Sequence, residues 1–235
     1  MSELVRPATL KKVAIIGYAT TADEAPYKDD SWEIWGLNSL YKHIQGVPIS
    51  RYSRWFEIHR KDYLLKTQPE HWEKLKEFSR VYMTEKHEDI PNSEPYPLDE
   101  IVNELKCVPY FTNSVSYMIA LAIAERYDVI GVWGVDMAVG PEYSYQRPSC
   151  EYFLGIAQGL GIQIVLPDAC DLLKTKYLYG FEDEKREKWD NKVDKTKNYC
   201  ESKVQECMQQ MQQVRDTLNQ YKGAAQMLQD IKKVW

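Results

Sequence analysis

The feature that most constrains this fold is a short apolar run near the middle of the chain. Residues 129–135 read VIGVWGV, with Asp128 before them and Asp136 after them, and no polar residue interrupts the run. A strand with one face in water would alternate apolar and polar residues, so this run predicts a strand that is buried on both faces. Strands of that kind occur almost only in parallel sheets with helices on both sides. The run therefore predicts an α/β fold with a carboxylate, Asp136, at the carboxyl end of a buried strand.

The same alternation of apolar runs and helical stretches continues over most of the chain. Short β-branched and aromatic runs predict further strands at 11–17, 31–38, 53–59, 80–84 and 161–167. Composition and apolar spacing predict helices at 69–78, 113–127 and 149–160. The proline-rich residues 89–100 predict a loop. Together these segments favour a mostly parallel sheet with flanking helices, in one domain of residues 1–180.

Residues 181–235 differ from the body and predict a separate helical tail. All eleven prolines lie before Phe181, after which glutamine, lysine and glutamate dominate. Steps of four and three along the tail meet only uncharged residues: Cys200, Val204, Cys207, Met211, Val214, Leu218, Tyr221, Ala225 and Leu228. This heptad pattern predicts a C-terminal coiled coil through which the chain forms homo-oligomers, although cysteine, alanine and tyrosine make a weak seam. The alternative is a helix that folds back along the body or packs on another partner.

Composition limits the class of partner and the compartment. A net charge of −5 gives no electrostatic argument for a general nucleic-acid binder. The five cysteines are odd in number and form no CxxC pair, which is typical of free thiols in a reducing compartment. A signal-peptide core and any run of about 18 apolar residues are missing, so we expect a soluble cytoplasmic protein without membrane contact. The four histidines show no metal-ligand spacing, so no metal site is expected.

Glycine or polar residues follow four of the predicted strands. They are Gly17 with Thr20, Asn38, Glu57 with His59, and Gly134 with Asp136. The carboxyl ends of parallel strands share one edge of the sheet, where ligands of α/β folds bind. The helix expected to begin near Asn113 and Ser114 would direct free backbone N–H groups at the same edge, which suits a phosphate. These residues form the candidate binding site.

Most of these candidates also have a structural interpretation. Thr20 is typical of a residue that caps a helix, and Asn38 of one that closes a turn. Asn113 and Ser114 are equally typical of ordinary N-cap residues. His59 fits a structural hydrogen bond as well as acid–base chemistry. The sequence leaves both interpretations open at each position.

Three segments in a fixed order carry a resemblance to known families. VAIIGYATTADEAP, WEIWGLN and TNSVSYMIALAIAERYDVIGVWGVDM together resemble the nucleotide-binding core of glycosyltransferase family 42, the bacterial sialyltransferases. They are also similar to the related motility-accessory and pterin-pyrophosphokinase-like proteins, and to uncharacterised bacteriophage proteins that carry WEIWG and RWFEIH. The resemblance covers roughly residues 11–172 and none of the tail. The matching residues are Gly17, Asn38, Ser114 with Tyr117 and Met118, and Gly134 with Asp136.

The resemblance implies a Rossmann-like glycosyltransferase domain with a nucleotide sugar as its donor substrate and no permanently bound cofactor. In such an enzyme Asn38, Ser114 and the backbone near Gly17 would hold the base, the ribose and the phosphates. A flexible lid would carry further phosphate contacts, and the residues at the matching place are Tyr143, Tyr145 and Arg147. Arg147 would neutralise the charge that develops on the leaving phosphate.

The general base is where this sequence departs from the family pattern. The sialyltransferases carry a histidine base after the lid, whereas no histidine here follows His87. If the chain is a transferase, the base comes from elsewhere, and the candidates are Asp136, Glu57, His59 and Glu142. We favour Asp136, because a carboxylate after a buried strand needs a partner or a ligand.

The main hypothesis is therefore a phage-encoded, nucleotide-sugar-dependent glycosyltransferase that acts on a hydroxylated acceptor. Hydroxymethylated DNA bases are one candidate acceptor. The evident sources of a basic stripe for duplex DNA are Arg51, Arg54, Arg60, Lys61, Lys174 and Lys176. Two rival hypotheses are a non-catalytic nucleotide-binding protein on the same scaffold and an assembly protein whose functional part is the coiled-coil tail.

Overall fold

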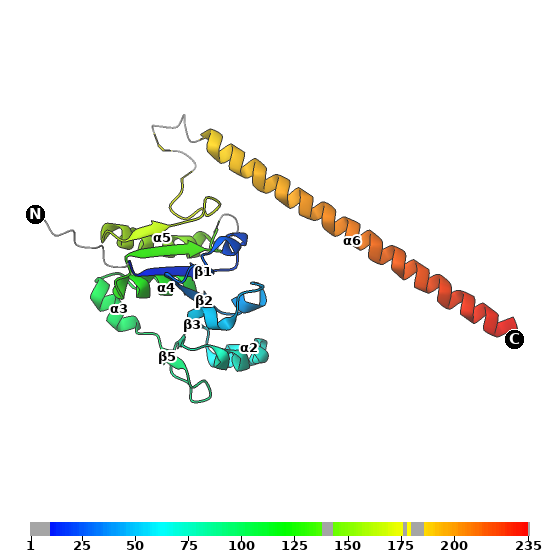
Figure 1. Ribbon diagram of the computed structural model, residues 1–235, viewed down its shortest axis with the longest axis horizontal. Helices are drawn as coiled ribbons and strands as arrows, with labels where there is room; N and C mark the ends of the chain where they lie inside the picture. Colours follow the sequence, from blue (N-terminus) through cyan, green and yellow to red (C-terminus); the bar gives the residue numbers. More distant parts are fainter. Residues whose placement is uncertain (1–9, 138–142, 176–177, 180–185, 235) are drawn as a thin grey trace, which may run out of the picture. The chain divides into compact units, whose positions relative to one another are not determined.

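The computed structural model describes residues 10–137, 143–175, 178–179 and 186–234 (Figure 1). The chain divides into two compact units, Met1–Lys174 and Thr175–Trp235. The first unit holds a seven-stranded sheet with helices on both faces, and the second is built around one long helix.

The sheet is open and all of its strand pairs are parallel. Its order is β5-β4-β3-β2-β1-β6-β7. The strands are β1 (Lys12–Ile16), β2 (Trp32–Leu37), β3 (Tyr52–Phe56), β4 (Val81–Met83), β5 (Ser93–Pro95), β6 (Val129–Trp133) and β7 (Gln163–Val165). The central strand β1 pairs Ala14 with Ile34 of β2 on one side and with Gly131 of β6 on the other. The Rossmann-like parallel sheet expected from the sequence is confirmed.

Helices cover both faces of the sheet (Figure 1). One face carries α3 (Leu98–Leu105), α4 (Ser114–Ala124) and α5 (Tyr143–Gly159). The other face carries α1 (Lys61–Thr67) and α2 (Pro69–Lys74). Short 3₁₀ turns lie in the connections: η1 (Thr20–Glu24), η2 (Leu40–Lys42), η3 (Ile49–Arg51) and η4 (Leu75–Glu77).

Two hydrophobic cores follow from the alternation of side chains along the central strands. Val13 and Ile15 of β1 pack in one core with α3, α4 and α5. Ala14 and Ile16 pack in the other core with η1, α1 and α2. All five residues of β6 are buried, which explains the unbroken apolar run of the sequence.

The prediction of a loop over residues 89–100 is wrong. This stretch contains the edge strand β5 and the first turn of α3. Pro95 ends β5 and Pro97 precedes α3, so both prolines stand where the missing N–H group is not needed. An edge strand tolerates a proline that a central strand would not, and the proline count alone did not separate these cases.

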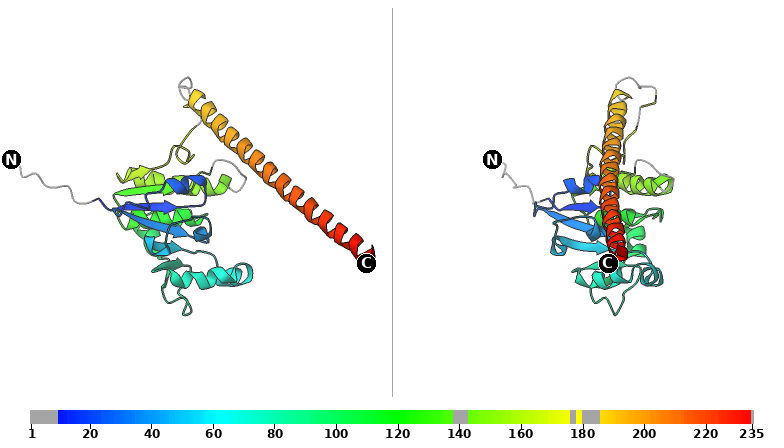
Figure 2. Two further views of the ribbon diagram at one scale, coloured as in Figure 1. Left: turned by 45° about the vertical axis from the view of Figure 1, so that its right-hand side comes forward. Right: turned by 90° about the vertical axis from the view of Figure 1, so that its right-hand side faces the viewer.

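The second unit consists mainly of α6 (Arg186–Val234), a helix of 49 residues that runs without a break (Figure 2). At 1.5 Å per residue it is roughly 74 Å long, and Gly223 lies within it. The long C-terminal helix is confirmed, whereas its coiling with a partner stays a prediction. Among the described helices, none combines the length and the hydrophobicity that a membrane span requires.

Candidate functional site

The strand order reverses between β1 and β6, which identifies the place where a ligand would bind. Strand β1 has β2 on one side and β6 on the other. The strands β2 to β5 are therefore added on one side of β1, and β6 and β7 are added on the other side. In open α/β sheets the ligand crevice lies outside the carboxyl ends of the strands at such a point. Here these ends lead into residues 17–25 and 134–137. The groups predicted from the sequence gather around this edge.

Gly17 and Gly134 bring the two segments into direct backbone contact. A Cβ atom on Gly17 would lie 2.3 Å from the carbonyl oxygen of Gly134, and one on Gly134 would lie 2.4 Å from that of Gly17. Gly134 also has a φ of +68°, in the left-handed region that favours glycine. The N–H group of Ala19 donates to the carbonyl of Gly134 at 2.9 Å. Both glycines are therefore required by the packing of the loops.

Asp136 supports this contact through Thr21, a residue that is 1% exposed. The hydroxyl of Thr21 donates to Oδ1 of Asp136 at 2.7 Å and accepts the N–H group of Gly134 at 2.8 Å. The backbone carbonyl of Asp136 accepts the N–H group of Asp171 at 3.1 Å. The carboxylate at the end of the buried strand thus has a protein partner, and it holds the loop after β6 against the loop after β1. Thr20, the neighbour singled out from the sequence, is exposed and begins η1.

Asn38 takes a strained backbone position at the end of β2. Its φ is +46°, and its backbone bonds to β3, donating to the carbonyl of Phe56 at 2.9 Å and accepting from Nε1 of Trp55 at 3.0 Å. Asparagine tolerates this conformation better than most residues, which supports the turn interpretation. Its side-chain oxygen is nevertheless buried and has no hydrogen-bond partner among the described residues. A buried acceptor without a donor is unusual, and a ligand N–H or O–H group would satisfy it.

Glu57 and His59 form the most organised pair of titratable groups at this edge. Glu57 directly follows β3 and is fully buried. One carboxylate oxygen accepts from Nδ1 of His59 at 2.6 Å and from the backbone N–H of His59 at 3.1 Å. The other oxygen contacts Nε2 of His71 at 2.6 Å, and Nδ1 of His71 lies 3.2 Å from the hydroxyl of Tyr41. His71 is fully buried, whereas the side chain of His59 is 47% exposed.

The charges of this pair stabilise each other. Burial alone would raise the pKa of Glu57, but the hydrogen bonds from His59 and His71 outweigh it and hold that pKa below its usual range. The hydrogen bond to Glu57 raises the pKa of His59 above its ordinary value, against a smaller opposing effect of burial. Glu57 is therefore an ionised acceptor near neutral pH, and Nδ1 of His59 carries the proton between them. This leaves Nε2 of His59 as the atom that can take a proton from another molecule.

His71 and Tyr41 are functional candidates that the sequence argument missed. His71 stands four residues before Leu75 and seven before Phe78, and both of these are buried. A histidine at an apolar position of a predicted amphipathic helix is a signal for a buried hydrogen bond. Its partner Glu57 lies fourteen residues earlier, so only the fold reveals the contact.

Tyr18 and Ser39 connect the end of β1 to the ends of β2 and β3. The hydroxyl groups of Tyr18 and Ser39 lie 3.2 Å apart. Burial raises the pKa of Tyr18, the hydrogen bonds of Ser39 oppose this, and the negative charge of Glu57 adds to the rise. The carboxylate of Glu57 therefore acts on a group that follows β1, so the three strand ends share one electrostatic environment.

Asn113 and Ser114 lie at the N-terminus of α4, as expected. Asn113 is the N-cap, and its side-chain oxygen accepts the N–H group of Ser116 at 3.0 Å. Its amide nitrogen donates to the carbonyl of Gln146 in α5 at 3.0 Å. Asn113 therefore caps α4 and holds α5, and its expected contact with a ligand stays a prediction. Ser114 differs, since its hydroxyl has no hydrogen-bond partner within the described ranges.

Residues 143–147, at the place expected for a lid, form the first turns of α5, and their phosphate contacts stay a prediction. The sequence placed the helix start after Pro148, but the helix begins at Tyr143 and contains that proline. The preceding segment supports this early start, because Thr112 donates its hydroxyl to the carbonyl of Tyr145 at 2.9 Å. Arg147 contacts Glu151 at 2.8 Å and donates to the carbonyl of Asp171 at 2.6 Å. Arg147 therefore holds the segment after β7 through hydrogen bonds. Glu142, another candidate for the general base, lies outside the described residues.

Two of the arginines expected to form a basic stripe for a DNA acceptor make structural contacts within the protein. Arg51 donates to the backbone carbonyls of Tyr27 and Trp32 at 2.7 and 3.0 Å. Arg54 is 9% exposed and pairs with Glu125 at the C-terminal end of α4, with Nη2 at 2.7 Å from the carboxylate. Both arginines are committed to structural contacts, and Lys176 lies outside the described residues.

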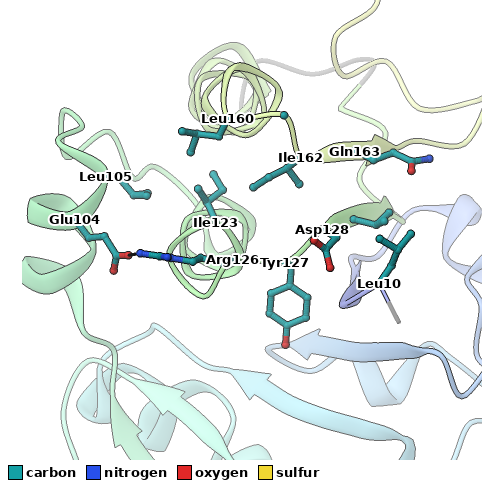
Figure 3. Close-up of a pocket in the computed structure, with 12 residues that line it drawn as sticks. Leu10, Glu104, Leu105, Ile123, Arg126, Tyr127, Asp128, Leu160, Ile162 and Gln163 are labelled. Atoms are coloured by element: carbon teal, nitrogen blue, oxygen red, sulfur yellow. Dashed lines mark ion pairs between the residues drawn. The ribbon is translucent and has the colours of Figure 1, made fainter. Parts of the chain in front are cut away.

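A pocket of about 700 Å³ lies at the opposite, amino-terminal edge of the sheet (Figure 3). Arg126 and Glu104 form an exposed ion pair at its rim, 3.9 Å apart. Its lining also includes Leu10, Ile123, Asp128 and Leu160. None of the site residues predicted from the sequence lines this pocket. Over the described part of the chain, no group of three or more histidine, cysteine or acidic residues could hold a metal ion.

The chain matches no protein-family model, and a search of curated proteins finds no significant match. Solved structures with a similar fold include the monofunctional α-2,3-sialyltransferase Cst-I from Campylobacter jejuni. The two are 16% identical, with a TM-score of 0.50 over 73% of this chain and 80% of that chain. The sialyltransferase CstII from the same organism, in complex with CMP-3FNeuAc, is 15% identical, with a TM-score of 0.48 over 69% of this chain and 81% of that one. The resemblance to bacterial sialyltransferases is therefore confirmed as a likeness of fold.

Proposed function

We propose that this protein is a glycosyltransferase that moves a sugar from a nucleotide-activated donor to a hydroxyl group, with His59 as the general base. The observation that carries the proposal is the hydrogen bond of 2.6 Å between Nδ1 of His59 and the buried Glu57, at the carboxyl edge of a Rossmann-like sheet. The fold shared with the sialyltransferase Cst-I supports the reaction class. The pair supplies a base at the edge where α/β enzymes bind their substrates.

The proton transfer follows from the orientation of the imidazole. Glu57 fixes the proton of His59 on Nδ1, so Nε2 has a lone pair for the proton of the acceptor hydroxyl. The acceptor oxygen forms a bond to the anomeric carbon as the bond from that carbon to the donor phosphate breaks. The electron pair of the broken bond leaves on the phosphate oxygen, and Glu57 stabilises the imidazolium that forms. General base catalysis of this kind contributes about 10²- to 10⁴-fold to a rate.

The spacing of the strands is consistent with a base at His59 and a nucleotide at the reversal of strand order. A nucleotide at the reversal of strand order would lie outside β1 and β6, whereas His59 follows β3. Three strand spacings separate β6 from β3, which is roughly 14 Å. A nucleotide sugar laid across the strand ends spans a distance of this order. We assign the buried oxygen of Asn38, at the end of the intervening strand β2, as a hydrogen-bond acceptor for the donor.

The other predicted residues take positioning roles in this proposal. Asp136 and Thr21 hold the loop after β6 against the loop after β1, so they shape the nucleotide end of the crevice. Asp136 has a hydroxyl partner, which leaves His59 as the better base. Ser114, the first residue of α4, is a candidate phosphate or ribose contact. The donor is bound as a substrate, so no permanent cofactor is required.

Ligand binding and turnover can be measured separately. We would screen the full chain by thermal shift against nucleotides and nucleotide sugars, and then measure nucleotide release with the donor that stabilises it. A ligand at 100 times its dissociation constant stabilises a protein by about 2.7 kcal/mol, which is readily detected. His59→Gln should keep this stabilisation and lower nucleotide release about 100-fold or more. His43→Gln is the matched control, since it makes the same change at an exposed histidine.

Each outcome separates the hypotheses. Binding with turnover that His59→Gln abolishes and His43→Gln preserves supports the proposal. Binding without turnover in the unmodified chain would favour a nucleotide-binding protein. Turnover that survives His59→Gln would show that the base lies elsewhere. A thermal-shift screen in which no nucleotide or nucleotide sugar stabilises the chain would refute the nucleotide-sugar proposal.

A further inference from the structure

The long helix α6 exposes an apolar seam along its length. Six residues of the heptad pattern are between 50 and 73% exposed: Val204, Met211, Val214, Leu218, Tyr221 and Leu228. In heptad notation Val204, Met211 and Leu218 occupy a positions, and Val214 and Tyr221 occupy d positions. Such a stripe on an isolated helix is buried when a second helix packs along it. The charges beside the seam indicate which helix that is.

One flank of the seam carries opposite charges in its two halves. The e positions follow the d positions and recur every seven residues. In chain order they are Asp194, Glu201, Met208, Arg215 and Lys222. Two acidic residues thus stand at fourteen and seven residues before Met208, and two basic residues stand at the same distances after it.

Most of these charges have no ion-pair partner of their own. Glu201 lies 3.9 Å from Lys197 in the same helix, a long and exposed contact. Asp194, Arg215 and Lys222 form no ion pair among the residues that the structure describes. Two pairs of charges off this flank do form ion pairs within the helix, Lys203 with Glu206 at 2.7 Å and Lys233 with Asp230 at 3.5 Å. The flank is therefore electrostatically incomplete in a single chain.

We propose that α6 forms an antiparallel two-stranded coiled coil with α6 of a second copy of this chain, centred on Met208. In an antiparallel pair, e positions of one helix face e positions of the other. Glu201 then meets Arg215 of the partner subunit, and Asp194 meets Lys222 of the partner subunit. The two-fold symmetry repeats both contacts, so four attractive pairs form across the dimer.

The same register fills the seam. An antiparallel coil packs a positions against d positions, and this register sets Val204 against Val214 of the partner subunit and Met211 against Cys207 of the partner subunit. A parallel dimer would instead set e positions against the g positions Thr196, Lys203, Gln210 and Thr217, where no e position finds an opposite charge. Charge complementarity therefore favours the antiparallel dimer over the parallel one.

Charge exchange in the full chain tests the arrangement. Sedimentation equilibrium under reducing conditions should show a dimer, and Glu201→Lys should raise its dissociation constant by about tenfold, because two attractive contacts become repulsive. Adding Arg215→Glu to that variant should restore the original value. Glu206→Lys makes the same charge change at a position off the seam, and it should leave the dissociation constant nearly unchanged.

Cross-linking tests the direction of the helices independently. In the variant Leu218→Cys, with Cys207→Ser to remove a competing thiol, oxidation should join the new thiol to Cys200 of the partner subunit. Disulfides between identical positions would show a parallel dimer and overturn the proposal. A monomeric chain, or equal weakening by Glu201→Lys and Glu206→Lys, would also overturn it.

Discussion

Replacing Glu57 by glutamine tests the arrangement at the end of β3 without a substrate. The variant keeps the shape of the side chain and removes its charge. Glu57 accepts two short side-chain hydrogen bonds, from His59 and His71, each at 2.6 Å. Hydrogen bonds to a charged group contribute about 1.5–3 kcal/mol and neutral ones about 0.5–1.5 kcal/mol, so each of the two bonds weakens by about 1 kcal/mol. His71 can meet the new amide with an unprotonated Nε2 and donate from Nδ1 to Tyr41, so the fold should survive.

We expect the free energy of unfolding to fall by about 2 kcal/mol in Glu57→Gln, and this difference should depend on pH. The pKa of Glu57 is lowered from its ordinary value of 4.5, so its contribution is present above pH 4.5 and lost as the pH falls through the lowered value. The pKa of His59 is raised from its ordinary value of 6.5, so its contribution is present below pH 6.5 and lost as the pH rises through the raised value. The difference between the two proteins should therefore be largest between pH 4.5 and 6.5 and decline on both sides.

Urea unfolding followed by tryptophan fluorescence measures this difference, because five tryptophans lie among the described residues of the first unit. Glu94→Gln is the matched control, since Glu94 pairs with Arg80 at the surface and both side chains are more than 40% exposed. An exposed pair contributes about 0–1 kcal/mol, and the control should show no decline on the alkaline side. A difference for Glu57→Gln that is flat with pH, or that grows above pH 8, would refute an ionised Glu57 bonded to a titrating His59.

Four further predictions concern activity and the loops around the site. Transfer or nucleotide release should rise with pH as His59 loses its proton, and Glu57→Gln should move this rise to lower pH; a pH–rate profile that does not move would contradict the pair. Gly134→Ala should destabilise the protein by about 3 kcal/mol in thermal unfolding, because its left-handed φ and the nearby carbonyl of Gly17 both oppose a Cβ atom. Thr21→Val should lower the free energy of unfolding by about 2 kcal/mol, since it leaves the buried N–H group of Gly134 without an acceptor. Asp136→Asn should keep nucleotide release within about tenfold of the unmodified chain, and a loss as large as that of a base would assign the base role to Asp136.

The fold could be predicted from the sequence because its strongest signals are local. The run at 129–135 is apolar since β6 is buried on both faces, and α4 shows the spacing and the N-cap of a buried helix. The proline-rich β5 and the early start of α5 were missed. In both cases tertiary contacts and position in the sheet decide whether a proline is tolerated, and these are not local properties.

The candidate site could be predicted only in part, because its contacts join distant segments. Glu57 and His59 are two residues apart, so their pairing was within reach of the sequence. Thr21 and Asp136 are 115 residues apart, and their hydrogen bond shows that the carboxylate after β6 has a partner in the loop after β1. His71 reaches Glu57 from α2. The sequence thus identified most of the residues at the edge, and the fold added the contacts from which the base and the positioning residues are proposed.

The energetics of Glu57 argue that its arrangement serves more than stability. Burying a carboxylate is costly even when it is paired, and well-packed apolar residues of similar volume often give a more stable core. Here the carboxylate is fully buried with one buried histidine, while a second histidine keeps half of its side chain in solvent. A half-exposed His59, whose pKa is raised by its hydrogen bond to the buried Glu57, is consistent with the proposed general base, because proteins tune acid–base groups for catalysis in this way.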